Sequence, residues 1–211
     1  MLRRFAIAAS VLVFAFAILF TSALRTAAVK YDFAPMTKVA GEAQVLGEET
    51  ANIDYYLAFP GRVLPDHPIW PLKALRDKVW LWITTNPSRS AELKLLFADK
   101  RVSMSKALFD KGKPEVGFST LTKAEKYLEE ASNQEKENRE AGIDTGDFLQ
   151  RIALASLKHF QVMEEIKAIA PEDAQPGIIQ TQNYTKKAYE DARNALQGAG
   201  ASVPENPFDW N

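Results

Sequence analysis

The chain contains no cysteine and only two histidines, His67 and His159. Without cysteine, it can form neither a disulfide framework nor a thiolate metal site. A zinc or di-iron site in a helical protein needs clustered histidine and carboxylate ligands, and no Glu-x-x-His pair is present. A soft-metal site built from His159, Met163 and Glu164 is conceivable, but a histidine at the rim of the fold beside a core methionine is the simpler interpretation. We therefore expect no metal site and no other cofactor.

The sequence patterns of several large enzyme classes are also missing. There is no Gly-x-Ser-x-Gly segment and no glycine-rich loop that would bind phosphate. Asp66 and His67 are adjacent, but no serine lies close enough in sequence to suggest a catalytic triad. The net charge of −1 gives no basic footprint for nucleic acid. The sequence thus predicts no enzyme, no catalytic residue and no nucleic-acid partner.

The composition is that of an ordinary globular protein, with 46% hydrophobic and 25% charged residues in 211. This length suits one domain and a targeting segment. The first 28 residues hold three arginines and no acid, so the remainder carries 23 basic and 27 acidic residues, a net charge of −4. The overall charge of that remainder gives it no attraction for an anionic lipid surface.

The N-terminal segment has the pattern of a membrane anchor. Arg3 and Arg4 precede an apolar run that begins at Phe5 and ends at Leu24, and Arg25 follows it. About 20 apolar residues can cross a bilayer as a helix, whereas the apolar part of a signal peptide usually has about 7–15. We therefore expect residues 5–24 to contact the lipid bilayer as a single span.

The arginines at the start predict the orientation of this span. Basic residues stay on the cytoplasmic side, so the N-terminus should be cytoplasmic and the C-terminal domain extracytoplasmic. Small residues near Ala23 and Ala28 would also permit cleavage by a signal peptidase, which would give a secreted protein. We favour the retained anchor in the cell membrane.

Residues 60–101 hold three of the four tryptophans and the clearest helix start in the chain, and we interpret them as the structural hub of a helical bundle. The residues that we assign to this hub are Trp70, Leu72, Leu75, Asp77, Val79, Trp82, Asn86, Pro87, Phe97 and Arg101.

The first hub helix is predicted over residues 71–84, after a loose turn at 68–70. Leu72, Leu75, Val79, Trp82 and Ile83 recur at three- and four-residue steps, so they share one helical face. We expect this face to pack on the bundle, with Trp80 pointing toward a different neighbour.

The second hub helix should begin at Asn86-Pro87, where a capping residue is followed by proline at the first helical position. Gly112 and Pro114 should end it near Lys111. Apolar residues follow two stripes along this helix. The solvent face between them is predicted to hold Glu92, Asp99, Lys106 and Asp110.

Arg101 lies between those two apolar stripes. A buried arginine needs a carboxylate, because an unpaired buried charge is very costly. Asp77 is the first candidate partner, and Glu129 or Glu130 is the second. The alternative is that the Arg101 side chain extends to the rim of the bundle.

Three more helices follow in the sequence. The third is predicted to begin near Ser119 or Thr120, with residues 132–140 as a solvated or frayed end. The fourth, from Asp144 or Thr145 to Ile169, is apolar around most of its circumference and should be the most buried, and the fifth should cover residues 178–197, after a break at Pro176-Gly177. The third helix carries an apolar seam made of Leu121, Ala124, Leu128 and Ala131.

The predicted fold class is all-α, with an N-terminal transmembrane or signal-anchor helix followed by an up-and-down bundle of four to five helices. Residues 1–28 would be the anchor or signal peptide, 29–65 a stalk and extended segment, 66–197 the bundle and 198–211 a flexible tail. The aromatic residues Phe208 and Trp210 could dock on the bundle or on a partner, or remain free.

Parts of the hub resemble a known family. The segment 65–68 reads Pro-Asp-His-Pro, 71–77 reads Pro-Leu-Lys-Ala-Leu-Arg-Asp, and the helices that follow contain Ala-Glu-Leu at 91–93, Ala-Asp-Lys-Arg at 98–101 and Lys-Ala-Glu-Lys-Tyr-Leu at 123–128. Over about residues 64–131 this pattern resembles DUF5667, a bacterial domain family of unknown function. The resemblance implies an exported, membrane-tethered helical domain and assigns no site residues.

These observations predict a non-catalytic, membrane-anchored extracytoplasmic helical domain that has a structural or protein-interaction role in the bacterial cell envelope, with an envelope protein as a possible partner. One alternative is a chaperone-like or binding bundle for a peptide or small apolar ligand, suggested by Trp70, Trp80, Tyr55, Tyr56 and the tail aromatics. The other alternative is a sensor ectodomain that signals through a membrane partner. The sequence leaves the oligomeric state open.

Overall fold

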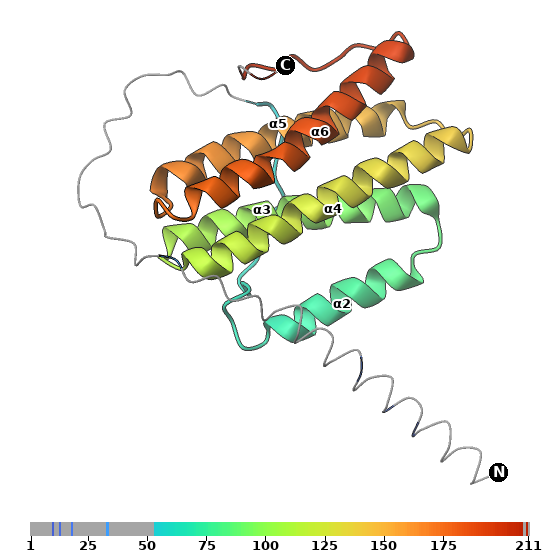
Figure 1. Ribbon diagram of the computed structural model, residues 1–211. Coiled ribbons are helices and arrows are strands. Elements are labelled where there is room, and N and C mark those ends of the chain that lie inside the picture. The colour runs from blue at the N-terminus through green and yellow to red at the C-terminus, as the bar shows by residue number, and fades with distance from the viewer. Residues whose placement is uncertain are drawn as a thin grey trace, which may run out of the picture.

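The computed structural model describes residues 53–208 and 210, together with the single residues 10, 13, 18 and 33. Within this part of the chain the fold is all-α, with no strand. The helices, shown in Figure 1, are α2 (Trp70–Ile83), α3 (Pro87–Asp110), α4 (Pro114–Glu140), α5 (Gly146–Ile169) and α6 (Gln175–Gly198).

Helices α3 to α6 form an up-and-down four-helix bundle, as predicted. Connections of three to five residues, at 111–113, 141–145 and 170–174, reverse the chain after each helix. Helix α3 packs most closely on α4, and α5 on α6, while the contacts of α4 with α6 and of α3 with α5 join the two pairs. Helix α2 stands outside this bundle, and its backbone approaches only α3 among the described helices (Figure 1).

The helix starts follow from local chemistry. Asn86 caps α3 as predicted, because its Oδ1 accepts a hydrogen bond from the backbone N–H of Arg89 at 2.9 Å. Helix α4 begins at Pro114, several residues before the predicted start, and α6 begins at Gln175 with Pro176 inside its first turn. Both prolines were predicted to break the chain. Each instead opens a helix, because the first turn needs no N–H from proline.

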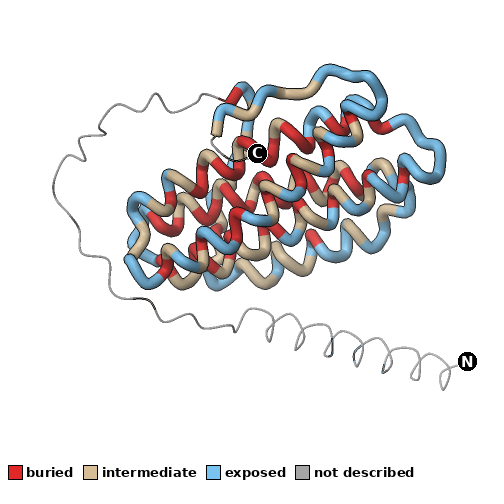
Figure 2. Tube along the Cα trace, turned by 45° about the horizontal axis from the view of Figure 1, so that its top comes forward, coloured by how far each residue is buried: buried red, intermediate tan, exposed pale blue. Residues whose placement is uncertain are grey.

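The core lies between the four bundle helices, where Figure 2 shows the buried residues gathered on facing sides. The predicted seam of α4 is confirmed, since all four of its residues are fully buried. Helix α5 is not more buried than the others, because α3 and α5 each bury twelve of 24 residues. The predicted apolar face of α5 is buried up to Ile166, and only Ile169 beyond it is exposed.

The C-terminal end of α4 is largely exposed, as its charges suggest, but it is helical to Glu140 and not frayed. Glu135 and Asn138 are the buried residues there. The Glu135 carboxylate accepts a hydrogen bond from Thr145 Oγ1 at 2.6 Å and pairs with Arg139 Nε at 3.0 Å. The mixed charges of residues 132–140 therefore fasten this helix end to the α4–α5 connection.

Segments on either side of the bundle also pack on it. Before α2, Ile53 and Leu64 are buried, and Tyr55 packs against the core. After α6 the chain folds back over the bundle (Figure 1). There the ring centroid of Phe208 lies 4.7 Å from that of Phe160 on α5. Trp210 packs on the same ring at 5.2 Å. The tail that the sequence suggested to be flexible is thus docked on the bundle.

No helix among the described residues is long and apolar enough to cross a bilayer. The predicted anchor, residues 5–24, lies outside the described part of the chain except for residues 10, 13 and 18. The same holds for the stalk up to residue 52, except for Phe33.

One glycine in α6 permits a close approach between α4 and α6, which gives a test of this packing. A Cβ on Gly177 would lie 2.7 Å from Cζ of the buried Phe118 ring, whereas a Cβ on Gly198 in the same helix would meet nothing within 4 Å. We expect Gly177→Ala to destabilise the protein by about 1–3 kcal/mol, because the ring must shift in a packed core. Gly198→Ala should leave stability unchanged or raise it by roughly a few tenths of a kcal/mol, because alanine favours the helix more than glycine does. Thermal unfolding of both variants measures the difference, and equal melting temperatures would contradict this packing.

Candidate functional site

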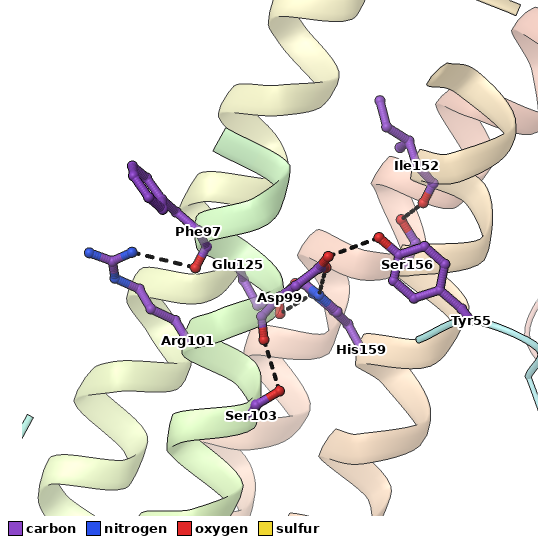
Figure 3. A network of polar contacts seen from close by, with 9 residues as sticks. All are labelled: Tyr55, Phe97, Asp99, Arg101, Ser103, Glu125, Ile152, Ser156 and His159. Carbon is purple, nitrogen blue, oxygen red and sulfur yellow. Dashed lines mark hydrogen bonds and ion pairs between the residues drawn. The ribbon is translucent and has the colours of Figure 1, made fainter. Parts of the chain in front are cut away.

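Three ionisable side chains from three helices meet inside the bundle. The Nε2 atom of His159 on α5 lies 3.0 Å from Oδ1 of Asp99 on α3, and its Nδ1 atom lies 3.0 Å from Oε1 of Glu125 on α4 (Figure 3). His159 and Glu125 are fully buried, and Asp99 nearly so. We call these three residues the ionic layer.

Two hydroxyl groups extend the ionic layer. Tyr55 Oη, from the segment before α2, donates a hydrogen bond to Oδ2 of Asp99 at 2.9 Å. Ser103 Oγ donates to the backbone carbonyl of Asp99 at 3.1 Å. Among the described residues, the second carboxylate oxygen of Glu125 has no hydrogen-bond partner. Burial, followed by the charge and hydrogen bond of Asp99, strongly raises the pKa of Tyr55, so this phenol remains a donor.

The geometry suits a charged imidazole ring. A carboxylate anion can only accept hydrogen bonds, so both ring nitrogens of His159 donate when both carboxyl groups are anions, which makes the ring an imidazolium. Burial lowers the pKa of His159, but the charges and hydrogen bonds of Glu125 and Asp99 outweigh this effect and raise it to about 9. The ring is therefore a cation at neutral pH, held between two anions.

The ionic layer separates two apolar clusters of the core. One cluster contains Ala98, Leu128 and Leu157, and the other contains Val102, Ala124 and Val162. On each of the three helices, the residue of the ionic layer lies between one residue of each cluster. The layer thus lies across the bundle between its two halves.

This arrangement identifies the ionic layer as a structural element. The His159 ring is shielded from solvent, and both of its nitrogens are occupied by protein carboxylates, so neither nitrogen is free to exchange a proton with a substrate. The predictions that His159 sits at the rim and that Asp99 faces solvent were wrong. A signal was present, because both residues occur within three or four positions of buried apolar residues on their helices.

The other candidate sites from the sequence do not assemble. No group of three or more His, Asp or Glu side chains in the described part of the chain could hold a metal ion. His67 accepts a hydrogen bond from the backbone N–H of Ile69 at 3.2 Å within an exposed turn. Its neighbour Asp66 pairs with Lys113 at 2.6 Å, which joins the segment before α2 to the connection between α3 and α4.

The outward face of α2 is the second unusual feature. The only buried residue of this helix is Asp77. The apolar residues that were predicted to pack on the bundle point away from it: Leu72 is 66% exposed, Val79 45%, Trp82 84% and Ile83 61%. Within the predicted structural hub, Phe97 and Arg101 of α3 are buried, whereas α2 meets the bundle by a different side from the one expected. Periodicity identified the apolar face but not the side of the helix that meets α3.

Helix α2 is held by its other side. Trp70 packs with Leu64, Met104 and Leu108, and the Lys73 ammonium group lies 5.2 Å from its ring centroid. Further along, the Trp80 ring meets Phe97 edge-on at 6.2 Å while remaining partly exposed. Leu75 is half-buried, and Asn86 and Pro87 are exposed at the start of α3.

Arg101 is buried against aromatic rings. Its guanidinium carbon lies 4.4 Å from the ring centroid of Tyr127, and Nη1 donates to the backbone carbonyl of Phe97 at 3.4 Å. Asp77, its predicted partner, is paired instead with Arg76 at 2.6 Å. Burial lowers the pKa of Arg101, and the negative charges of Asp77 and Glu130 partly counter this effect. The carboxylate predicted to stabilise Arg101 thus acts on it without a direct ion pair.

A hollow between α4 and α6 offers little room for a ligand. It is lined by polar residues that include Glu129, Asn133 and Lys187, and its volume is about 10 Å³. A space of this size holds about one water molecule.

The pKa of His159 makes stability depend on pH. A histidine whose pKa is raised by folding contributes stability that is complete below its unfolded pKa and is lost as the pH rises through the folded pKa. Here that window runs from about 6.5 to about 9. We expect the free energy of unfolding to fall by about 3 kcal/mol across it, as measured by urea unfolding of the full chain in mild detergent.

Two single-histidine variants serve as controls for this pH dependence. His67→Ala should keep the fall in stability, because His67 lies in an exposed turn. His159→Gln should be less stable at pH 6.5 and should lose most of the dependence. Unfolding free energies of the unsubstituted protein that stay constant from pH 6.5 to pH 9 would show that the ring is not charged in the folded state.

Comparisons with known proteins give a family and no more. A family model described as Domain of unknown function (DUF5667) matches residues 62–173. The match contains α2, α3, α4 and α5 in full, including the ionic layer, and leaves α6 and the tail outside. No curated protein and no solved structure matches the chain. Since the matched residues make up more than half of the chain and extend the resemblance found over residues 64–131, this protein belongs to the DUF5667 family.

Proposed function

We propose that the protein is a membrane-anchored extracytoplasmic helical domain with a non-catalytic, structural or interaction role in the cell envelope. The observation that carries the proposal is the N-terminal sequence, where Arg3 and Arg4 precede the uncharged, mostly apolar residues 5–24. A run of this length and composition suits a single transmembrane helix. The arginines favour a cytoplasmic N-terminus and an extracytoplasmic bundle.

The character of the bundle supports a non-catalytic role. Its ionic layer uses both nitrogens of His159 to hold α3, α4 and α5 together, so the ring serves the packing of the helices. One outward surface of the described residues, the exposed side of α2, is rich in large apolar side chains. Exposed apolar surface of this kind is typical of surfaces that contact a partner or a membrane.

Peptide binding is the second candidate function. The exposed aromatic residues Tyr56, Phe59 and Trp82 favour it, because such side chains are common where proteins bind one another. A peptide would have to bind along the outer side of α2. The experiment in the next subsection distinguishes this occupant from a lipid surface.

Fractionation of cells that produce the full chain with a C-terminal tag tests the anchor. We expect the protein to stay with the membranes in high-salt or alkaline buffer and to be released by detergent. Leu12→Arg combined with Leu19→Arg should move it to the soluble fraction, since each charge at the centre of a span opposes insertion by about 3 kcal/mol. Asn183→Arg, at an exposed position of α6, is the matched control and should stay with the membranes.

The orientation can be tested in the same cells, because the chain has no cysteine of its own. Gln180→Cys, on the exposed side of α6, should react with a membrane-impermeant maleimide added to intact spheroplasts. Release of the protein by salt alone would refute the anchor. Labelling that occurs only after the cells are lysed would refute the extracytoplasmic location.

A further inference from the structure

Helix α2 exposes an apolar stripe that an ordinary amphipathic helix of a soluble domain would bury. Such helices turn their apolar side to the core and their charges to water. In α2 the buried residue is a carboxylate, Asp77, whereas Leu72, Val79 and Ile83 lie on the side away from α3. Ile69, just before the helix, continues this exposed apolar stripe at a three-residue step. Trp82 lies beside it and is the most exposed large apolar side chain of the helix.

Two exposed basic groups of α2, Arg76 and Lys78, lie beside this apolar stripe. The one acid of the helix, Asp77, is turned inward and paired with Arg76. Lys73 lies on the inner side, where its ammonium group donates to two backbone carbonyls of the preceding segment. On α4, burial lowers the pKa of Lys123, and the positive charges of Arg101, Lys78 and Lys126 lower it further. Burial also lowers the pKa of Lys73, where the charge of Asp77 opposes this effect and cations that include Arg76 and Lys100 add to it.

The clustering of these cations is local. Residues 29–211 carry a net charge of −4, so the positive region around α2 contrasts with the acidic chain around it. A helix with tryptophan and aliphatic residues on one side and basic residues next to them has the composition of helices that lie in the interface of an anionic bilayer. Tryptophan is itself enriched at the level of the lipid headgroups.

We propose that α2 is an interfacial helix that lies on the anionic bilayer holding residues 5–24, with Leu72, Val79, Trp82 and Ile83 in the headgroup–acyl boundary. The exposed Arg76 and Lys78 beside them would contact lipid phosphates. This inference rests on the proposed anchor. It adds a second membrane contact and an orientation in which α2, and not α6 or the tail, faces the bilayer.

Because the anchor already holds the protein at the membrane, even weak binding by α2 would be enough to dock the bundle on the bilayer. Phe33, nine positions after the apolar run, packs edge-on against Phe118 of α4, with ring centroids 5.5 Å apart. Eight residues, 25–32, therefore separate the predicted span from this contact, and eight residues can extend over at most roughly 27 Å. The anchor thus keeps the bundle, and α2 with it, at a high effective concentration near the membrane. The apolar stripe and its surrounding cations then decide which face docks.

Charge also argues against a second copy as the occupant of this face. A symmetric dimer places the same patch of both chains together. The α2 cations of one chain would then lie opposite those of the other, and like charges in contact are repulsive. Anionic headgroups have the complementary charge.

The test uses the full chain, reconstituted in vesicles, with an environment-sensitive NBD label on a single cysteine. Val79→Cys places the label on the outward side of α2, and Gln180→Cys places it on an exposed site of α6 as the control. We expect the emission of the label at position 79 to shift to the blue and to rise several-fold in vesicles with phosphatidylglycerol. The emission should change little in phosphatidylcholine alone, and added salt should weaken the effect. The label at position 180 should keep the emission of an aqueous environment in both lipids.

A charge-matched pair of variants tests the role of the cations. Lys78→Glu reverses an exposed charge of α2, a change of two units, and each unit should change the docking equilibrium about fivefold. The variant should therefore reduce docking about 25-fold and abolish most of the NBD response. Lys136→Glu makes the same change at an exposed position of α4 and should leave the response intact.

The outcomes separate this inference from the anchor. If the protein fails to remain in the vesicles after an alkaline wash, the proposed function fails. If it remains but position 79 reports water in both lipids, the anchor stands and the interfacial helix is wrong. Three other results also overturn the inference. A shift at position 79 that is equally large in neutral lipid would mean apolar docking without headgroup contact. A shift that appears only when a peptide is added would indicate a peptide as the occupant, and one that grows with the protein-to-lipid ratio would indicate a second copy.

Discussion

The fold depends on a histidine cation held between two carboxylates in the middle of the bundle. Burying a charge is costly, and removing one partner of a buried pair costs about 3–5 kcal/mol because the other charge is left without compensation. Asp99, Glu125 and His159 come from three different helices and meet at 3.0 Å on both sides of the ring. If any of these helices slid by one turn, it would leave a charge unpaired in an apolar core. We interpret the ionic layer as the element that fixes the relative positions of α3, α4 and α5, while the apolar clusters above and below supply most of the stability.

The pairing of buried charges also bears on the orientation of α2. This helix turns Asp77 toward the bundle, where it binds Arg76 and partly offsets the positive charge of the buried Arg101. Trp70 and Trp80 pack on the inner side beside Asp77, while the aliphatic residues and Trp82 are left on the outer side. In the proposed arrangement, the bilayer that holds the N-terminal run would give this outer side an apolar surrounding without a protein partner.

Much of this architecture could be predicted from the sequence, because helix starts and ends depend on neighbouring residues. Asn86-Pro87 marks the start of α3, and the regular spacing of Leu121, Ala124, Leu128 and Ala131 identified the buried side of α4. Pairings between helices could not be predicted in this way. The contact of Asp99 with His159 joins residues 60 positions apart. Taken alone, an aspartate on a helix is usually exposed to solvent, and a histidine is usually placed at the rim of a core. The outward face of α2 was missed for a related reason: periodicity groups residues on one side of a helix, but which side meets α3 is set by Asp77 and Trp70 together. The N-terminal anchor remains a prediction from composition.

The charge state of His159 tests the ionic layer most directly. In a His67→Ala background, the full chain contains one histidine, so its two ring nitrogens can be observed without ambiguity by ¹⁵N nuclear magnetic resonance. With the ring between two ionised carboxylates, both nitrogens should carry a proton at pH 7.5, and one proton should be lost as the pH approaches about 9. One protonated and one bare nitrogen at pH 7.5 would mean that the ring is neutral, and the charged layer that holds α3, α4 and α5 in place would not exist.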